Sequence, residues 1–245
     1  MRISISGTAH SGKSSLVKSF LYTWKNYKSP EKTYRDLLKE EGLDHSSKTT
    51  TDTQERILDF MIDQLQSYDD TSKVIYDRCP LDNIAYSMWC HDKNKEGFTR
   101  EFISKQITLV RESMRHLDII FICRYNEQVG KTTEKENELR EKDPSYIKEV
   151  DNILYSLYQQ WMQNPESNVF FPKEDVPCLI VLPDDQQQRI DLIAEYVNPQ
   201  GELFADEESI LNPDNLNELE QLVKSQQASL DQEEKEKELL KKFGI

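Results

Sequence analysis

The chain has 245 residues, 31 basic and 45 acidic side chains, and a formal net charge of −14 at pH 7. This length suits one α/β domain with an appended segment, and the acidic balance argues against general nucleic-acid binding, which needs a basic surface. No apolar run is long enough to cross a membrane, and the first residues lead into a predicted strand without a signal-peptide pattern, so we expect a cytoplasmic protein without membrane contact.

The first predicted elements are a strand, a glycine-rich loop and a helix. The stretch RISIS alternates isoleucine with serine, as in a short strand, and apolar residues recur at helical spacing from Leu16 to Leu21. Between them, GTAHSGKS fits the phosphate-loop spacing G-x-x-x-x-G-K-[ST], in which backbone N–H groups surround phosphate oxygens. In this motif Lys13 reaches the β- and γ-phosphates and the Ser14 hydroxyl binds Mg²⁺. The motif and its context predict a site for ATP and Mg²⁺.

The whole loop is expected to contact the nucleotide. Its predicted binding residues are Gly7, Thr8, Ala9, His10, Ser11, Gly12, Lys13, Ser14 and Ser15. His10 lies at a variable position of the motif, so its side chain is given no separate role. Because we expect a helix to begin near Gly12, the unpaired N–H groups and the dipole of that helix add to the attraction for anions.

Mostly polar residues follow the first helix. We predict a short second strand near Tyr27, followed by a helix in which Tyr34, Leu37 and Leu38 share a face. The next helix covers the stretch TDTQERILDFMIDQLQSYDD, where apolar residues form a stripe at helical spacing. Asp52 or Thr53 is the predicted N-cap of this helix, because short polar side chains accept hydrogen bonds from the free N–H groups of a first turn.

The stretch KVIYDR is a predicted strand that ends in Asp77 and Arg78. An aspartate at the carboxyl end of a strand is where open α/β sheets place ligand chemistry. Motors of the AAA or helicase type usually have Asp-Glu here, and GTPase switches carry N-K-x-D, but the sequence has neither pattern. Asp-Arg suits phosphoryl transfer instead. The carboxylate orients the Mg²⁺ hydration shell or takes the acceptor proton, while the guanidinium binds phosphate oxygens.

The remaining elements continue the alternation of helices and strands. A helix over residues 99–116 is followed by the strand LDIIFICRY, a helix that ends near Trp161, the strand CLIVLP and a last helix. Nearly continuous apolar strands are typical of a parallel sheet that is covered on both faces. Five strand candidates alternating with helices predict a three-layer α/β/α fold of the P-loop NTPase type, with a mainly parallel five-stranded sheet.

Residues 199–245 are predicted to form an acidic helical extension to a domain that spans residues 1–198. After Pro199 and Gly201 break the pattern, residues 201–245 contain twelve acidic and five basic side chains, which is half of the net charge. Interleaved Glu and Lys residues favour a solvated helical tail. Docking of its apolar face on the domain or on a second protomer, and hence a homodimer, is the alternative.

The stretch DRCPLDNIAY resembles the thymidylate-kinase signature D-R-[YH]-x-x-S-x-x-A-Y. It matches at Asp77, Arg78, Ala85 and Tyr86, with a cysteine in place of the aromatic residue and Asp82 in place of the serine. The strand HLDIIFIC likewise resembles the PDLTIYL strand of the same kinases. The chain is also similar to the small P-loop proteins, many of them encoded by tailed bacteriophages, that are grouped with the kinase domain of bifunctional nicotinamide riboside kinases.

These resemblances imply a nucleoside or nucleotide kinase that uses ATP and Mg²⁺, with a pyrimidine deoxynucleotide as the favoured small-molecule acceptor. The implied catalytic residues are Lys13, Asp77, Arg78 and Arg140, the last in a lid over about residues 126–146. The implied metal ligands are Ser14 and Asp77. Candidates chosen from their placement or the signature are Tyr34, Arg35, Gln54, Asp82 and Tyr86 for the acceptor, and Arg124 for ATP.

Two other interpretations stay open. One is a kinase that phosphorylates a hydroxymethylated base in phage DNA, although the acidic charge disfavours a DNA partner. The other is a nucleotide-dependent ATPase or switch whose acidic tail holds a protein partner. Acceptor-dependent ATP consumption separates a kinase from a switch.

Overall fold

The computed structural model describes residues 1–127, 141, 143–163, 169–172 and 175–203. Within these residues, four parallel strands form one sheet in the order β2-β1-β3-β4. The strands are β1 (Arg2–Ser6), β2 (Val74–Asp77), β3 (Ile119–Cys123) and β4 (Cys178–Leu182). The helices are α1 (Lys13–Thr23), α2 (Tyr34–Glu41), η1 (Ser46–Lys48), α3 (Thr51–Gln66), α4 (Pro80–Asp92), α5 (Arg100–Ser113), η2 (Met114–His116), α7 (Pro144–Gln163) and α8 (Gln186–Tyr196), of which η1 and η2 are 3₁₀ helices.

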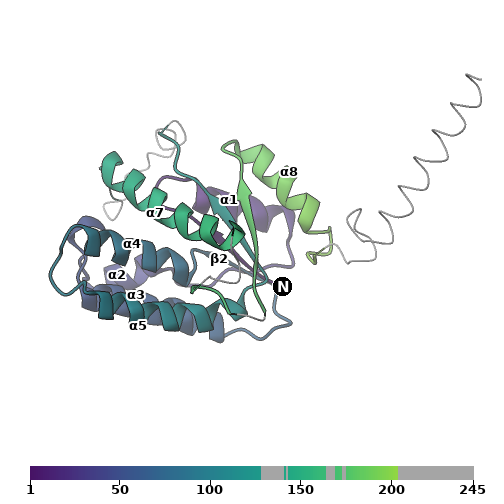
Figure 1. The fold of residues 1–245 in the computed structure, drawn as a ribbon. Helices are drawn as coiled ribbons and strands as arrows, with labels where there is room; N and C mark the ends of the chain where they lie inside the picture. Colours follow the sequence, from purple (N-terminus) through teal and green to yellow (C-terminus); the bar gives the residue numbers. More distant parts are fainter. Residues whose placement is uncertain (128–140, 142, 164–168, 173–174, 204–245) are drawn as a thin grey trace, which may run out of the picture.

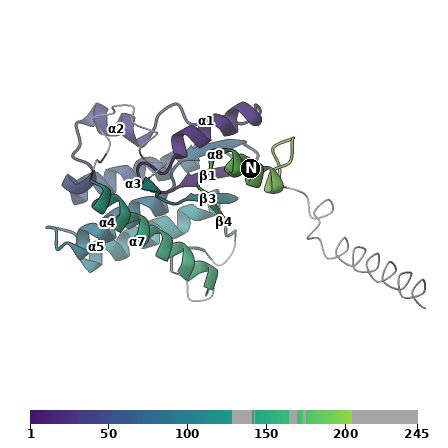
Figure 2. The same ribbon diagram turned by 90° about the horizontal axis from the view of Figure 1, so that it is seen from above.

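Two layers of helices cover the sheet. Helices α1 and α8 lie on one face, whereas α3, α4, α5 and α7 lie on the other (Figure 1 and Figure 2). Each layer closes its own apolar core: one core includes Phe20 of α1 and Ile193 of α8, and the other includes Ile84 of α4 and Leu154 of α7. All residues of β1 and β3 are buried between these layers. The predicted three-layer α/β/α fold is therefore confirmed.

The sheet differs from the prediction in its number of strands. The sequence predicted five, whereas the described residues contain four, and the expected strand near Tyr27 is reduced to one parallel bridge between Lys28 and Val74. Pro30 follows two residues later, and because proline has no N–H group it cannot extend the ladder. Tyr27 packs its ring against Phe20 instead, with the ring centroids 4.9 Å apart.

The start of α3 also corrects a prediction. Neither Asp52 nor Thr53 is the N-cap, because the helix begins at Thr51 and both residues lie in its first turn. The cap is Thr50, whose Oγ1 accepts a hydrogen bond from the N–H of Thr53 at 3.2 Å. Asp52 still lies where a negative charge interacts favourably with the helix dipole.

The strand order places a switch point next to the phosphate loop. The chain passes from β1 to β2 on one side and then returns across β1 to β3 on the other. Ile5 of β1 pairs with Asp77 of β2, so the loop after β1 begins beside the end of β2. In open α/β sheets, ligands bind in the crevice that such a reversal leaves at the carboxyl ends of the strands.

Several predictions fall wholly or partly outside the described residues. Arg140 and most of the lid stretch lie there, as does the acidic extension beyond Leu203. Leu203 itself forms an antiparallel bridge with Val197. None of the described helices is long and apolar enough to span a membrane.

Candidate active site

The phosphate loop follows β1 and depends on glycine at its two ends. Gly7 has a φ of +145°, and a Cβ atom there would lie 2.3 Å from the carbonyl oxygen of Cys123. Gly12 has a φ of +83° at the N-cap of α1. Both backbone conformations are ones that glycine adopts readily and other residues rarely adopt. The spacing of the motif therefore matches two positions where the backbone requires glycine.

Lys13 is buried inside this loop. Its ammonium group donates hydrogen bonds to the carbonyl oxygen of Thr8 and, at 3.2 Å, to Oγ of Ser11. Burial lowers the pKa of Lys13 to about 7, and the nearby charge of Arg78 acts in the same direction. An anion in the loop would favour the charged ammonium group and offset this burial.

Ser14 and Asp77 meet where α1 begins and β2 ends. The Ser14 hydroxyl donates a hydrogen bond to Oδ2 of Asp77 at 2.7 Å, and Arg35 lies 3.7 Å from the same oxygen. Burial alone would raise the pKa of Asp77, but the charges of Lys13 and Arg35 outweigh burial and hold it below its ordinary value. Asp77 is therefore anionic at neutral pH, and its buried Oδ1 accepts no hydrogen bond from the described residues.

The oxygen atoms of the Ser14 hydroxyl and the Asp77 carboxylate fit a Mg²⁺ site. No group of three or more His, Cys, Asp or Glu side chains that could hold a metal ion occurs among the described residues. Mg²⁺ at phosphate sites does not need such a group, because it usually takes one or two protein ligands together with substrate phosphates and waters. The Ser14 hydroxyl and the Asp77 carboxylate supply ligands of that kind.

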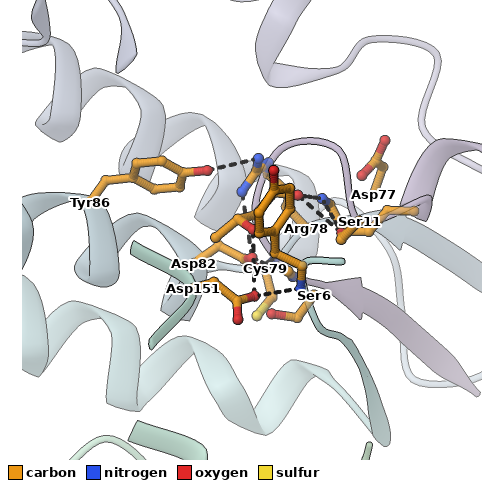
Figure 3. A network of polar contacts seen from close by, with 12 residues as sticks. Ser6, Ser11, Asp77, Arg78, Cys79, Asp82, Tyr86 and Asp151 are labelled. Atoms are coloured by element: carbon orange, nitrogen blue, oxygen red, sulfur yellow. Dashed lines mark hydrogen bonds and ion pairs between the residues drawn. The ribbon is translucent and has the colours of Figure 1, made fainter. Parts of the chain in front are cut away.

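Arg78 combines an unusual backbone conformation with a buried guanidinium. Its φ is +96°, and its guanidinium contacts the rings of Tyr34 and Tyr86, 5.0 and 5.2 Å from their centroids. Nη2 donates a hydrogen bond to the Tyr86 hydroxyl at 3.0 Å (Figure 3). Nη1 is 3.5 Å from Asp82, yet Nε and Nη1 make no hydrogen bond with the described residues. A buried guanidinium with free N–H groups is suited to bind a phosphate.

Asp82 links the phosphate loop to the start of α4. Its fully buried carboxylate accepts hydrogen bonds from the N–H of Gly7 at 2.8 Å and from the N–H of Cys79 at 2.9 Å. The second bond is part of a capping box at the start of α4. Asp82 therefore holds the loop against the helix that carries Tyr86, and it also lines the adjoining cavity.

Two cavities adjoin Arg78 and share Tyr34 and Arg35 in their walls. The first has a volume of about 50 Å³, reaches Thr8 of the phosphate loop, and contains Gln54. Gln54 is buried, with Nε2 donating to Oγ1 of Thr49 at 2.8 Å and Oε1 free of hydrogen bonds to the described residues. The further polar and aromatic residues that line this cavity are His45, Ser46, Asp82, Asn83, Tyr86, Glu141 and Tyr146. The second cavity, of about 380 Å³, lies beside Ser14 and Asp77.

A family model described as an AAA domain matches residues 2–167. The chain belongs to this AAA domain family. No curated protein is similar enough in sequence to match it.

Solved structures show the fold of this AAA domain. A deoxyadenosine kinase from M. mycoides with products dCMP and dCDP bound is 20% identical, has a TM-score of 0.54, and covers 79% of this chain and 96% of its own. The thymidylate kinase from Candida albicans is 16% identical, with a TM-score of 0.56 and coverage of 79% and 90%. NadR in complex with NR is 14% identical, with a TM-score of 0.54 and coverage of 80% and 51%. The AAA domain thus has the fold of the P-loop nucleoside and nucleotide kinases.

Arg124 and His10 of the AAA domain contact other residues near the loop. Arg124 donates from Nε to Oδ2 of Asp151 at 2.7 Å, and its guanidinium lies 3.9 Å from the ring centroid of Tyr155. His10 places Nε2 at 2.9 Å from the carbonyl oxygen of Glu141. The structure thus brings the predicted loop residues together with Asp77, Arg78, Tyr34, Arg35, Gln54, Asp82 and Tyr86. Arg124 is connected to Thr8 of the loop through Asp151.

Two buried charged residues beside the phosphate loop, Asp151 within the AAA domain and Arg189 beyond it, were not predicted from the sequence. Asp151 of α7, which is labelled in Figure 3, is 3% exposed and lies 3.5 Å from Oγ1 of Thr8. Arg189 of α8 is fully buried and donates a hydrogen bond to the Ser11 carbonyl at 2.7 Å. Each lies on the inward face of its helix, next in helical spacing to apolar residues such as Leu154 and Ile193. A charge on an apolar helix face is the signal that could have identified them.

Proposed function

We propose that this protein is an ATP-dependent phosphotransferase that moves the γ-phosphoryl group to a hydroxyl or phosphate of a nucleoside or nucleotide. The main support is one observation at the end of β2. Asp77 contacts Ser14 of the phosphate loop at 2.7 Å, and Arg78, the next residue, lines the cavity with two N–H groups that make no hydrogen bond with the described part of the chain. A metal-binding pair and a phosphate-binding cation thus adjoin, as in-line transfer between two bound substrates requires.

In this mechanism the protein contributes positioning and charge rather than covalent chemistry. The loop N–H groups and Lys13 bind the phosphates of ATP, and Ser14 and Asp77 would hold Mg²⁺. A metal ion held by these two residues would supply positive charge against the phosphate oxygens of ATP. Arg78 orients the acceptor group and adds positive charge as the transition state forms. We propose that Arg140, in the stretch 126–146, adds a further positive charge from a lid that excludes water.

The cavity beside Arg78 supports a nucleoside-like acceptor. Tyr34, Tyr86 and Tyr146 offer aromatic faces for a base or sugar, and Gln54 and Asn83 offer amide groups. The Oε1 of Gln54, which accepts no hydrogen bond from the described residues, can accept one from an exocyclic amine or a ring N–H of a base. Structures of the M. mycoides deoxyadenosine kinase hold dCTP or dATP, so a protein with this fold accommodates both base classes. From the Asp-Arg signature, we propose a pyrimidine deoxynucleotide as the favoured acceptor.

A screen with γ-labelled ATP tests this proposal. The candidate acceptors are the common nucleosides, their 5′-monophosphates, nicotinamide riboside, and duplex DNA that contains hydroxymethylated bases. We expect label on a pyrimidine deoxynucleoside or its monophosphate, and ATP consumption that depends on that acceptor. Label on the DNA would mean that a DNA base, and not a small nucleotide, is the acceptor. Binding of DNA should then depend strongly on the salt concentration.

The same screen separates a kinase from a switch. ATP hydrolysis that is indifferent to every acceptor, with binding of a protein partner that is lost when residues 205–245 are removed, would overturn the proposal. The matched control is Asp77→Asn, which keeps the size of the side chain and removes its charge. Label transfer that persists at full rate in this variant would refute the role proposed for Asp77.

A further inference from the structure

Arg189 of α8 is the largest fully buried side chain of the described residues, and no step proposed above uses it. It lies beyond residues 2–167, the segment that matches the family model. Charged side chains are almost never fully buried unless they have partners, so the contacts of Arg189 need a reason.

The guanidinium of Arg189 joins two loops. Nη1 donates a hydrogen bond to the carbonyl oxygen of Ser11 at 2.7 Å, and Nε donates one to the carbonyl oxygen of Pro183 at 2.6 Å. Ser11 belongs to the phosphate loop, whereas Pro183 follows β4 and leads into α8. One rigid, planar group therefore fixes the loop to the segment between β4 and α8.

The bond to Ser11 also sets the direction of a neighbouring N–H group. The C=O of Ser11 and the N–H of Gly12 belong to one planar, trans peptide unit, so they point in opposite directions. When Arg189 holds the Ser11 oxygen at the back of the loop, it turns the Gly12 N–H the other way. N–H groups of this loop are the donors that surround phosphate oxygens, and a carbonyl turned toward the phosphates would repel them.

The described residues do not neutralise the charge of Arg189. Arg189 forms no ion pair with a carboxylate of the described residues, and its Nη2 is buried without a hydrogen bond to them. Cys123, whose carbonyl lies against Gly7, is close to this charge: burial raises the pKa of Cys123 to about 11, and the charges of Arg189 and Lys13 oppose that rise. A buried cation of this kind is stabilised when an anion binds nearby.

We propose that Arg189 is a positioning residue of the phosphate loop, which aims the Gly12 N–H and adds a fixed positive charge behind the site for a nucleoside polyphosphate. This inference rests on the proposed binding of ATP, but it does not depend on the acceptor. Lysine keeps the charge yet cannot bridge the two carbonyl groups as the planar fork does. The identity of the side chain, and not its charge alone, therefore matters.

Direct binding experiments test the proposal. The affinities of ATP, ADP and inorganic tripolyphosphate, each with Mg²⁺, are measured by titration calorimetry for the wild type, Arg189→Lys and Arg189→Gln. The control is Arg2→Lys, since Arg2 is also buried, at 4% exposed, but lies at the opposite end of β1. We expect Arg189→Lys to weaken all three ligands by about tenfold, the equivalent of one hydrogen bond to a charged group. Arg2→Lys should leave them within about twofold of the wild type.

Thermal melts show that each variant is folded, and Arg189→Lys keeps the test valid if Arg189→Gln does not fold. Equal affinities in the wild type and Arg189→Lys would overturn the inference while leaving the proposed function intact. A loss for ATP and ADP but not for tripolyphosphate would also overturn it, because the effect would then concern the nucleoside. A wild type that binds none of the three ligands would overturn both proposals.

Discussion

The two ends of the sheet each hold a buried arginine, and the two arginines are held in different ways. Arg2 begins β1 and forms an ion pair with Asp70 at 2.9 Å. Arg78 follows β2 with a φ of +96°, and its ion-pair partner Asp82, 3.5 Å away, already accepts two backbone hydrogen bonds. Arg2 thus has a carboxylate partner and one buried N–H, at Nε, without a hydrogen bond to the described residues, whereas Arg78 has two such N–H groups, at Nε and Nη1, and a strained backbone.

This difference indicates which end awaits a ligand. Besides Arg78, the carboxyl end has Asp77 and Gln54 with buried oxygens that accept no hydrogen bond from the described residues, and Lys13 with a pKa lowered by burial. Unpaired buried groups destabilise the free protein, and they are retained where a ligand completes them. Substitutions at this end should therefore change activity more than stability, and substitutions at the amino end should do the reverse.

The largest effect is expected for Lys13→Ala at the carboxyl end. The variant should lower phosphoryl transfer by about a thousandfold, because an electrostatic contact to the transferred group is lost. The Tm should stay the same or rise, since a buried amine with a disfavoured charged form is removed. Rates with labelled ATP and a thermal melt followed by circular dichroism give both values. A variant that loses its fold together with its activity would contradict the distinction between the two ends.

Asp77→Asn should have the next largest effect. We expect turnover to fall by about a hundredfold, because the neutral amide binds Mg²⁺ poorly and cannot take a proton. ATP affinity without Mg²⁺ should stay within a few-fold of the wild type, since Ser14 and the loop N–H groups remain. Stopped-flow rates and calorimetric titration separate the two quantities. An unchanged rate would refute the assignment of Asp77.

The third prediction compares the two arginines directly. Arg78→Gln should raise the KM of the acceptor by about tenfold or more with little change in Tm, because it removes a phosphate-binding cation from a strained position. Arg2→Gln should leave the kinetic constants unchanged and destabilise the fold by about 1 to 3 kcal/mol, because it breaks polar contacts of a largely buried side chain. Steady-state kinetics and denaturant unfolding of both variants provide the test. Matching profiles for the two variants would show that Arg78 is a structural arginine as well.

The sequence was sufficient for the parts of the site that depend on local spacing. The phosphate-loop motif located Lys13 and Ser14, and the end of a predicted strand located Asp77. The contact between Ser14 and Asp77 at 2.7 Å then follows from the pairing of neighbouring parallel strands. The predicted fifth strand was wrong because pairing ends after Lys28, where Pro30 removes a donor.

Long-range contacts were not predictable from one sequence. The serine-to-aspartate departure at Asp82 gave no sign that its carboxylate would bind the N–H of Gly7, which is 75 residues away in the chain. Arg189 and Asp151 meet the loop from two different helices, and only their placement on apolar helix faces distinguishes them from surface charges. Such contacts depend on how helices pack against the sheet, which periodicity within one helix does not determine.

The smallest expected effect is a pH dependence that belongs to the carboxyl end alone. In the free protein the pKa of Lys13 is lowered to about 7, chiefly by burial and then by Arg78. Bound phosphates favour the charged ammonium and raise this pKa, so binding of ATP takes up a proton above pH 7. ATP affinity should then fall as the pH rises, by at most about tenfold per unit. Stability of the free protein should rise over the same range, because the unfolded chain, with an ordinary lysine pKa, binds more protons than the folded one.

Calorimetry at pH 8 in two buffers of different ionisation enthalpy measures the proton uptake directly. The matched control is Lys13→Arg, which stays charged throughout this range and removes the titration of Lys13 while the phosphates of ATP still titrate. An uptake near one proton in the wild type, larger than in the control, is expected. Equal uptake in both proteins would mean that Lys13 is already charged in the free loop. The free protein would then already carry the positive charge of Lys13. Arg78 alone would distinguish the carboxyl end of the sheet from the amino end, where Arg2 lies.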